Sequence, residues 1–280
     1  MRIGAHVPVR GGILGAVRAA AECRAEAVQI FASNPRGWAP PRIARAEAEL
    51  FREAFPRAGL GPLFVHAPYL VNVASPNPEF LRKSIELARL TLAACDEIGA
   101  AGLVVHAGSG GPGEPGEALE RATASLRTLA AESGPAVIVE LTAGTSGSVA
   151  ATIADALRLF EAVDHPRLAL CLDTCHLFAA GYALDRPEGV AACFDELRAS
   201  GLGPRLLLVH ANDAKHPRGS RLDRHEHIGE GHIGVEGFFE ILRRPELADL
   251  ALVVETPGPL HELARNIATL RRLATSSVTD

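Results

Sequence analysis

The run Leu103-Val104-Val105 stops at His106, and this pattern, a short apolar run that ends at a residue able to bind metal, decides the fold. Five further runs end in the same way, at His66, Glu140, Asp173, His210 and Glu255. With 33 Asp or Glu and 11 His among 280 residues, composition alone does not place one at all six ends. Short apolar runs bounded by glycine and proline are typical of buried strands in a parallel sheet. The six residues should therefore stand at strand ends.

Apolar runs alternate with longer amphipathic stretches along the whole chain. Strands are expected at residues 2–5 and 26–31 and before each of the six run ends, and helices near 12–23, 44–57, Pro78–Ile98, 117–132, 148–162, 188–199, 235–243 and up to Ala274. Eight strand–helix units, in a chain not far above the usual ~250 residues, predict an α/β fold, a (β/α)8 TIM barrel. The strand ends would then converge on a metal site at the C-terminal mouth of the barrel.

An open doubly wound sheet is the competing architecture, and it would need a glycine-rich phosphate-binding turn after the first strand. The richest glycine stretch, residues 108–113, follows the fourth strand instead. Neither a linker nor a break in composition divides the chain. We therefore expect residues 1–280 to form one domain.

Composition limits the classes of protein to consider. The chain is 48% hydrophobic with a formal net charge of -5, so bulk charge does not indicate a nucleic-acid binder, although bound cations would change the local field. No stretch approaches the ~20 apolar residues that cross a bilayer. Five cysteines without a regular framework indicate a reducing compartment, so we expect a cytoplasmic protein. Cys171 and Cys175 flank Asp173, but buried free cysteines usually pack as small hydrophobic residues.

The six residues at the run ends would offer three imidazoles and three carboxylates. Two divalent ions roughly 3.5–4 Å apart are commonly bridged by one carboxylate, and such a set can hold both. Mixed His and carboxylate ligands suit zinc, or manganese where oxygen ligands dominate. A single such residue is more often a hydrogen-bonded group at the rim, but clustered carboxylates would repel each other without a cation.

Two further segments extend this set. His176 follows Asp173 by three residues, and Asp223-Arg224-His225 places two possible ligands at i and i+2. Residues at this spacing project the same way from extended backbone, so His176, Asp223 and His225 could form a third metal site. On spacing alone the segment could equally be a solvated charged face. His6 follows the first strand and could support a ligand from outside the metal sphere.

Longer motifs resemble the endonuclease IV family, the metal-dependent apurinic/apyrimidinic endonucleases of base-excision DNA repair. The resemblance covers essentially the whole chain. It is carried by the segments Gly4–Val7, Asn34–Trp38, His66–Leu70, Asp173–Tyr182, His210–Lys215, Gly219–His225, Gly229–Gly234 and Val254–Pro257.

The resemblance implies a (β/α)8 barrel with three Zn²⁺ ions per chain, with Mn²⁺ as a substitute at one or more sites. It implies that His66, His106 and Glu140 hold the first ion and that Glu140, the catalytic residue, bridges to the second. The other implied ligands are Asp173, His210 and Glu255 for the second ion and His176, Asp223 and His225 for the third. The implied partner is double-stranded DNA with abasic sites or blocked 3′ ends, cut 5′ to the lesion by a monomeric hydrolase to leave a 3′-hydroxyl and a 5′-deoxyribose phosphate.

Three residues resemble those that this family inserts into DNA, namely Arg36, Tyr69 and Leu70. Without the resemblance, packing of Tyr69 and Leu70 against the next helix would be favoured. Candidate phosphate contacts are Arg42, Lys215, Arg218, Arg221 and Arg224. The sequence departs from the family pattern at Gly37, Leu141 and Ser146, which affects one DNA contact and the loop after Glu140.

The main alternative is a metal-dependent sugar isomerase or epimerase on the same kind of barrel. Such an enzyme needs at most two ions, and it has no use for a third site at Asp223 and His225 or for an inserting Tyr69. A DNA-damage binding module with a relic metal site is a second alternative. The complete ligand set argues against a relic, which would have lost at least one ligand.

Overall fold

Eight parallel strands close into a barrel in the computed structural model, which describes residues 1–112 and 115–276. Around the barrel the strands follow the order β1-β10-β7-β6-β5-β4-β3-β2. Their bounds are β1 (Arg2–His6), β2 (Val28–Phe31), β3 (Leu63–His66), β4 (Gly102–His106), β5 (Ala136–Glu140), β6 (Leu168–Asp173), β7 (Leu206–His210) and β10 (Ala251–Val254). The predicted (β/α)8 barrel is confirmed. The end of the glycine-rich stretch 108–113 lies outside the described residues.

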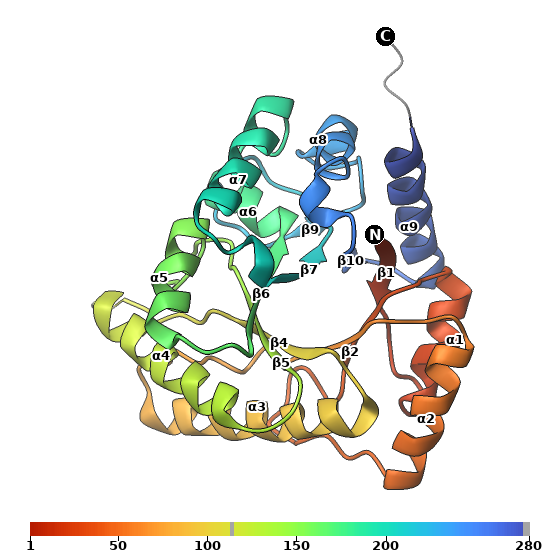
Figure 1. The fold of residues 1–280 in the computed structure, drawn as a ribbon, viewed down its shortest axis with the longest axis vertical. Coiled ribbons are helices and arrows are strands. Elements are labelled where there is room, and N and C mark those ends of the chain that lie inside the picture. Colours follow the sequence, from red (N-terminus) through yellow and green to blue (C-terminus); the bar gives the residue numbers. More distant parts are fainter. Residues whose placement is uncertain (113–114, 277–280) are drawn as a thin grey trace.

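Helices surround the barrel, with α1, α2 and α9 on one side and α4 and α5 on the other (Figure 1). Their bounds are α1 (Leu14–Cys23), α2 (Arg45–Arg57), α3 (Pro78–Ile98), α4 (Pro115–Ala131), α5 (Ile153–Val163), α7 (Pro187–Ala199), α8 (Gly234–Ile241) and α9 (Leu260–Thr275). Two 3-10 turns cover Gly203–Arg205 and Pro245–Leu247. Among the described residues, no helix combines the length and apolar character needed to cross a membrane.

One predicted helix boundary was wrong, because α5 begins at Ile153 and not near residue 148. The Thr152 side chain accepts a hydrogen bond from the Asp155 backbone N–H, and the Asp155 side chain accepts one from the Thr152 N–H. This reciprocal capping box satisfies free donors of the first turn and fixes where the helix begins.

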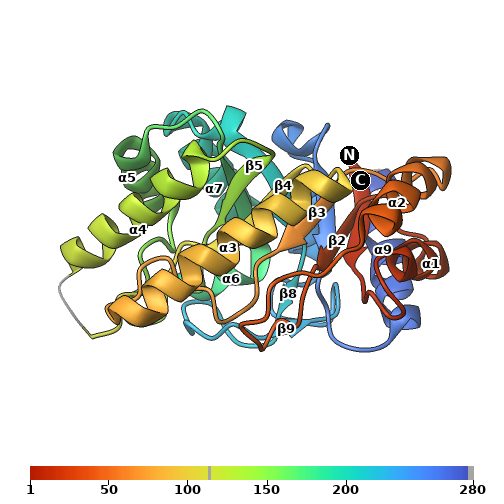
Figure 2. The same cartoon turned by 90° about the horizontal axis from the view of Figure 1, so that it is seen from below.

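Three short elements were not predicted, and all three lie at the mouth of the barrel. The helix α6 (Thr174–Ala180) follows β6 directly, and Asp173 caps it by accepting a hydrogen bond from His176 N at 3.0 Å. The strands β8 (Asp213–Ala214) and β9 (His225–Glu226) form an antiparallel ribbon. Figure 2 shows this ribbon at one end of the barrel beside α6, which contacts β8.

The strand side chains alternate between two apolar layers, one inside the barrel and one between the barrel and the helices. The inner layer fills the barrel with Ala27, Phe64, Val104, Ile138, Ala169, Cys171, Leu208, Ala251 and Val253. The alternate residues, such as Leu103 and Val105, face the helices in a separate outer layer. This alternation follows from the two-residue repeat of a strand. Close approach of β1 and β2 requires Gly4, since a Cβ there would lie 1.6 Å from the Ala27 carbonyl oxygen.

Candidate metal centre

The inward positions at the strand ends form a polar layer on top of the apolar filling of the barrel. Six strands end at or directly before a predicted ligand that lies two positions after an inner-layer residue and therefore also points inward. These ligands are His66, His106, Glu140, Asp173, His210 and Glu255. On β1 and β2 the corresponding residues are His6 and Gln29. All eight strands therefore contribute one polar side chain to the same end of the barrel.

Glu140 lies at the centre of two groups of possible ligands. Its Oε2 is 3.1 Å from His66 Nε2 and 3.3 Å from His106 Nε2. Its Oε1 is 2.9 Å from Nδ1 of His210, which also lies 3.3 Å from Glu255 Oε2 and 3.9 Å from Asp173 Oδ2. The two oxygens of one buried carboxylate thus face different groups, as required of a bridging ligand.

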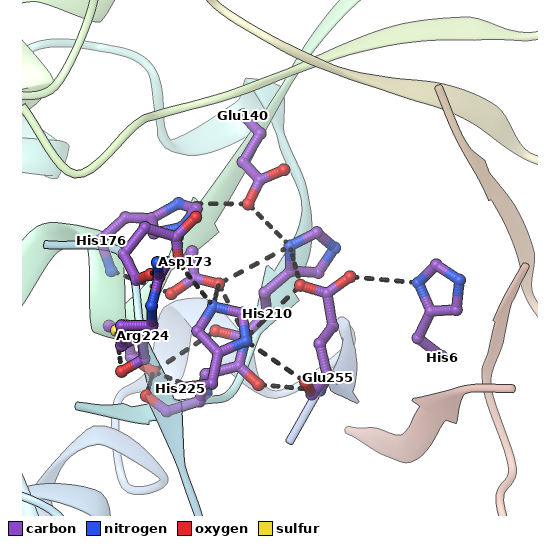
Figure 3. A network of polar contacts seen from close by, with 12 residues as sticks. His6, Glu140, Asp173, His176, His210, Arg224, His225 and Glu255 are labelled. Carbon is purple, nitrogen blue, oxygen red and sulfur yellow. Dashed lines mark hydrogen bonds and ion pairs between the residues drawn. The ribbon is translucent and has the colours of Figure 1, made fainter. Parts of the chain in front are cut away.

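A third group lies beside the second and is built by the short elements at the mouth. Asp223 Oδ1 is 3.2 Å from His176 Nε2, on α6, and 3.3 Å from His225 Nε2, on β9. His225 Nε2 is also 3.6 Å from Asp173 Oδ2, which links this group to the second (Figure 3). The structure therefore brings the nine side chains together in the three sets that the family resemblance implied, with ligand atoms of each set within 4.8 Å of one another.

Each histidine whose ring faces the third group is anchored through its other nitrogen. His176 Nδ1 donates to the Leu141 carbonyl at 2.9 Å, and His225 Nδ1 donates to the Glu255 carbonyl at 3.3 Å. Within residues 1–112 and 115–276, neither buried Nε2 atom makes a well-oriented hydrogen bond, although Asp223 Oδ1 lies close to both. A buried nitrogen on a fixed ring, directed toward a carboxylate without a well-oriented hydrogen bond, is what a metal ligand requires, so the residues fit a bound divalent ion.

Charges within the cluster change the proton affinities of its members. Burial opposes ionisation of Glu140, but the imidazoles of His210 and His106 hold the pKa of this carboxyl well below its usual range. Burial likewise disfavours the charged form of His225, yet Asp173 and Asp223 raise the pKa of its imidazole to about 9. Anionic carboxylates thus hold cationic imidazoles together, and a divalent ion can replace those protons.

Two neighbouring residues on the strand-end segment 212–213 support the ligands without joining the three groups. Asn212 Nδ2 donates to Asp173 Oδ2 at 2.7 Å, and its Oδ1 accepts from the Glu255 backbone N–H at 2.8 Å. Asp213 is fully buried and accepts backbone hydrogen bonds from the glycine-rich segment 229–234. This segment follows β9, so Asp213 fixes the chain that carries His225.

Cys171 and Cys175 are both buried, and burial raises the pKa of each thiol to about 12. Cys171 belongs to the inner layer of the barrel. Cys175 lies within ligand distance of Asp173 and His225, but its thiol donates to the Arg224 carbonyl at 3.5 Å. Both cysteines therefore pack as buried residues, as the sequence predicted.

A cleft of about 1060 Å³ opens over the groups and extends to Arg10, Arg18 and His261. Tyr69 lies on its lip with 60% of its surface exposed, and its ring contacts Phe31 at a centroid distance of 5.1 Å.

The two loops expected to meet DNA are joined, because Tyr69 N donates to the Pro35 carbonyl at 3.0 Å. Arg36 and Leu70 are exposed on these loops. The five candidate phosphate contacts Arg42, Lys215, Arg218, Arg221 and Arg224 are also exposed.

The structure shows the surroundings of Leu141, Ser146 and Gly37, the three departures from the family pattern. Leu141 is fully buried, and its carbonyl anchors His176. The Ser146 carbonyl accepts from Ser109 Oγ at 3.4 Å. At Gly37 an added Cβ would lie 3.5 Å from the Asn34 side chain, an ordinary contact, so space does not demand glycine there.

Sequence reasoning missed Gln29 and the supporting roles of Asn212 and Asp213. A signal for Gln29 was present, because it is a polar residue inside the apolar run Val28–Phe31 and stands two residues after the inward Ala27. Asn212 and Asp213 directly follow a strand end, but the sequence does not show which backbone groups they meet.

Known proteins resemble this chain over nearly its full length. Residues 17–273 match the family model described as xylose isomerase-like TIM barrel. The probable endonuclease 4 of Streptomyces coelicolor is 42% identical over 97% of this chain and 94% of its own length. That of Methanoculleus marisnigri is 40% identical over 97% and 98%.

Solved structures give the same result. Endonuclease IV from Thermus thermophilus superposes with a TM-score of 0.87 at 36% identity and covers 98% of both chains. A D-tagatose 3-epimerase-like protein has a TM-score of 0.75 at 22% identity, with coverage of 98% of this chain and 97% of its own, a likeness of fold alone. By both sequence and structure, the chain belongs to the endonuclease IV family of xylose isomerase-like TIM barrels.

Proposed function

We propose that the protein is a DNA-repair apurinic/apyrimidinic endonuclease of the deoxyribonuclease IV type. It hydrolyses the phosphodiester 5′ to an abasic site in double-stranded DNA and leaves a 3′-hydroxyl and a 5′-deoxyribose phosphate. Blocked 3′ ends are a second substrate. The observation that carries the proposal is the third group, His176, Asp223 and His225, placed beside the two groups that share Glu140. A sugar isomerase with at most two ions would leave that group unused.

The proposed metals are three Zn²⁺ ions, with Mn²⁺ as a substitute at one or more sites. His66, His106 and Glu140 would hold the first ion, and Glu140, Asp173, His210 and Glu255 the second. His176, Asp223 and His225 would hold the third. Such ions supply a water of lowered pKa and positive charge against the phosphate and leaving-group oxygens.

The residues of the chain supply position and charge balance. Glu140 would serve both ions, because its two oxygens face different groups. The backbone carbonyls that anchor His176 and His225 keep their free nitrogens directed into the cluster. Electrostatic groups fixed before the reaction cost no reorganisation when charge develops on the phosphate.

For DNA binding we propose that Tyr69, Leu70 and Arg36 contact the distorted duplex at the lesion. The exposed Tyr69 ring at the lip of the cleft, followed by the exposed Leu70 side chain, suits the space left by a missing base. Lost stacking at an abasic site lowers the energy needed to move the sugar out of the helix toward the cluster. We further propose that residues 1–280 act as one domain, as a monomer, in the cytoplasm.

Cleavage of a labelled duplex with one tetrahydrofuran abasic analogue tests the function, with metal content measured on the same sample. This analogue cannot undergo β-elimination, so a cut on its 5′ side with a 3′-hydroxyl product demonstrates hydrolysis. About three metals per chain are expected, and an intact duplex serves as the control substrate. Absence of a cut by fully metallated protein would overturn the proposal and direct the search to polyol substrates.

A further inference from the structure

Gln29 is the only glutamine in the chain, and it is fully buried at the end of β2. Its position on the strand corresponds to that of the predicted ligands on the other strands, and its Cα is in register with His6 on β1. A neutral amide therefore occupies a place in a layer that is otherwise made of imidazoles and carboxylates. Its contacts show what it does there.

The amide of Gln29 connects two possible ligands of the second group. Its Nε2 lies 2.6 Å from Glu255 Oε1 and 2.9 Å from His6 Nδ1, and its Oε1 lies 2.9 Å from His210 Nε2. An ionised carboxylate only accepts hydrogen bonds, so the NH₂ group must face Glu255. The carbonyl oxygen then faces His210, whose Nε2 must carry a hydrogen and donate it.

This arrangement determines which atoms of both ligands face the second group. With its Nε2–H bound to Gln29, His210 presents Nδ1 toward Glu140 Oε1, at 2.9 Å, and Glu255 Oε2, at 3.3 Å. The same amide, together with His6 Nδ1 at 3.2 Å, holds Oε1 of Glu255 and leaves Oε2 turned toward the group.

His210 is anchored differently from His66, His176 and His225. His66, His176 and His225 each donate Nδ1–H to a backbone carbonyl and present Nε2 to the cluster. His210 is reversed, and its anchor is a side chain. Because a histidine ring can present either nitrogen, this anchor selects the one that faces the second group.

We infer that Gln29 is a positioning residue that fixes Nδ1 of His210 and Oε2 of Glu255 as the atoms presented to the second ion. The inference rests on the proposed metal centre. Loss of a group that orients metal ligands typically weakens metal affinity about 10- to 100-fold. Removal of the amide should therefore lower the affinity for one zinc ion by this factor. The affinity for the ion at His66 and His106 should be unchanged.

Gln29→Met tests this, since methionine has a similar length and lacks the amide. The matched control is Thr91→Val on α3, which removes a buried hydroxyl that donates to the Leu87 carbonyl at 2.7 Å, away from the cluster. Zn²⁺ affinities are measured by competition with a chromophoric chelator. Long-range ¹H–¹⁵N correlations on protein with labelled histidine report which nitrogen of His210 carries the proton, with His210→Ala used for assignment.

In the wild-type protein, His210 should carry a proton at Nε2 that exchanges slowly with water. In Gln29→Met this exchange should be faster and one zinc ion should bind about 10- to 100-fold more weakly, whereas Thr91→Val should resemble wild type. Wild-type affinity for every ion in Gln29→Met, or a wild-type His210 protonated at Nδ1 alone in the zinc-loaded protein, would overturn the inference. The second of these needs no variant, so the test survives a Gln29→Met variant that fails to fold. Wild-type protein that binds no zinc would instead overturn the proposed centre itself, and the role of Gln29 with it.

Discussion

Asp213→Asn should destabilise the mouth of the barrel by an amount that the hydrogen bonds allow us to work out. Oδ1 of Asp213 accepts from the backbone N–H groups of Ala214 (2.8 Å) and Ile233 (2.9 Å), and Oδ2 accepts from Gly229 (2.9 Å) and Gly231 (3.1 Å). A fifth donor, the Gly234 N–H, lies 3.4 Å from Oδ1 and 3.2 Å from Oδ2. Asparagine has one acceptor oxygen, so its NH₂ group must face either Ala214 and Ile233 or Gly229 and Gly231, whereas Gly234 can reach the oxygen in either orientation. No rotation of the amide avoids this.

The size of the loss in the free energy of unfolding depends on how deeply the donors are buried. Ala214 and Ile233 are buried, whereas Gly229 and Gly231 are partly exposed, so the amide oxygen should keep the buried pair. A donor left without a partner costs about 1–3 kcal/mol, with the low end for groups that water can reach. Two partly exposed donors therefore predict a loss of about 2 kcal/mol in the free energy of unfolding. The loosened segment should also weaken the third metal, because it follows His225 directly.

Urea unfolding of the metal-free protein measures the first effect, and zinc titration measures the second. Asp249→Asn, which changes an exposed carboxylate by the same atoms, is the matched control and should leave both unchanged. A free energy of unfolding within about 0.5 kcal/mol of wild type would refute the hydrogen-bond reasoning, since surface substitutions commonly fall in that range. Lower stability with wild-type affinity for all three ions would refute the link to the third group.

Four further predictions concern the proposed reaction and the fold. Glu140→Gln should lower abasic-site cleavage at least about 100-fold while DNA binding is partly retained, because it removes charge from the carboxylate that both groups share. Single-turnover cleavage measures this effect, with Glu49→Gln, an exposed position on α2, as the control. Tyr69→Ala should weaken binding to abasic duplex more than to intact duplex in a titration at fixed salt, and equal losses would indicate general packing. Treatment with EDTA and heat should abolish cleavage, and added Zn²⁺ should restore it, whereas activity that survives prolonged chelation would contradict the metal proposal. Thr152→Ala should lower the free energy of unfolding by about 1 kcal/mol through loss of the capping box, with cleavage unchanged.

The barrel was predictable because six of its eight strands are short apolar runs that stop at a polar residue. The helix α3 was predicted with its observed bounds, and local chemistry explains this. Asn77 accepts backbone hydrogen bonds at the start, Pro78 follows it, and Gly99 ends the helix in the left-handed region at φ 74°.

The elements that build the third group were not predictable as secondary structure. The helix α6 has seven residues, six of them buried, so it lacks a polar face to reveal a helical repeat. The strands β8 and β9 have two residues each, too few to show alternation. On spacing alone, Asp223 and His225 stayed ambiguous between a metal site and a solvated face. Only the resemblance favoured the metal site before the structure brought them to His176.

The way the histidines are anchored has a consequence for how the sequence can drift. The rings of His66, His176 and His225 are held by the carbonyls of Ala67, Leu141 and Glu255, which every amino acid carries. Positions 67 and 141 can therefore change side chain without deleting an anchor, and Leu141 shows such a departure from the family pattern. The anchor of His210 is the amide side chain of Gln29, so a single codon change there can remove it. Mutational tolerance around the cluster should accordingly be uneven, broad at positions 67 and 141 and narrow at position 29.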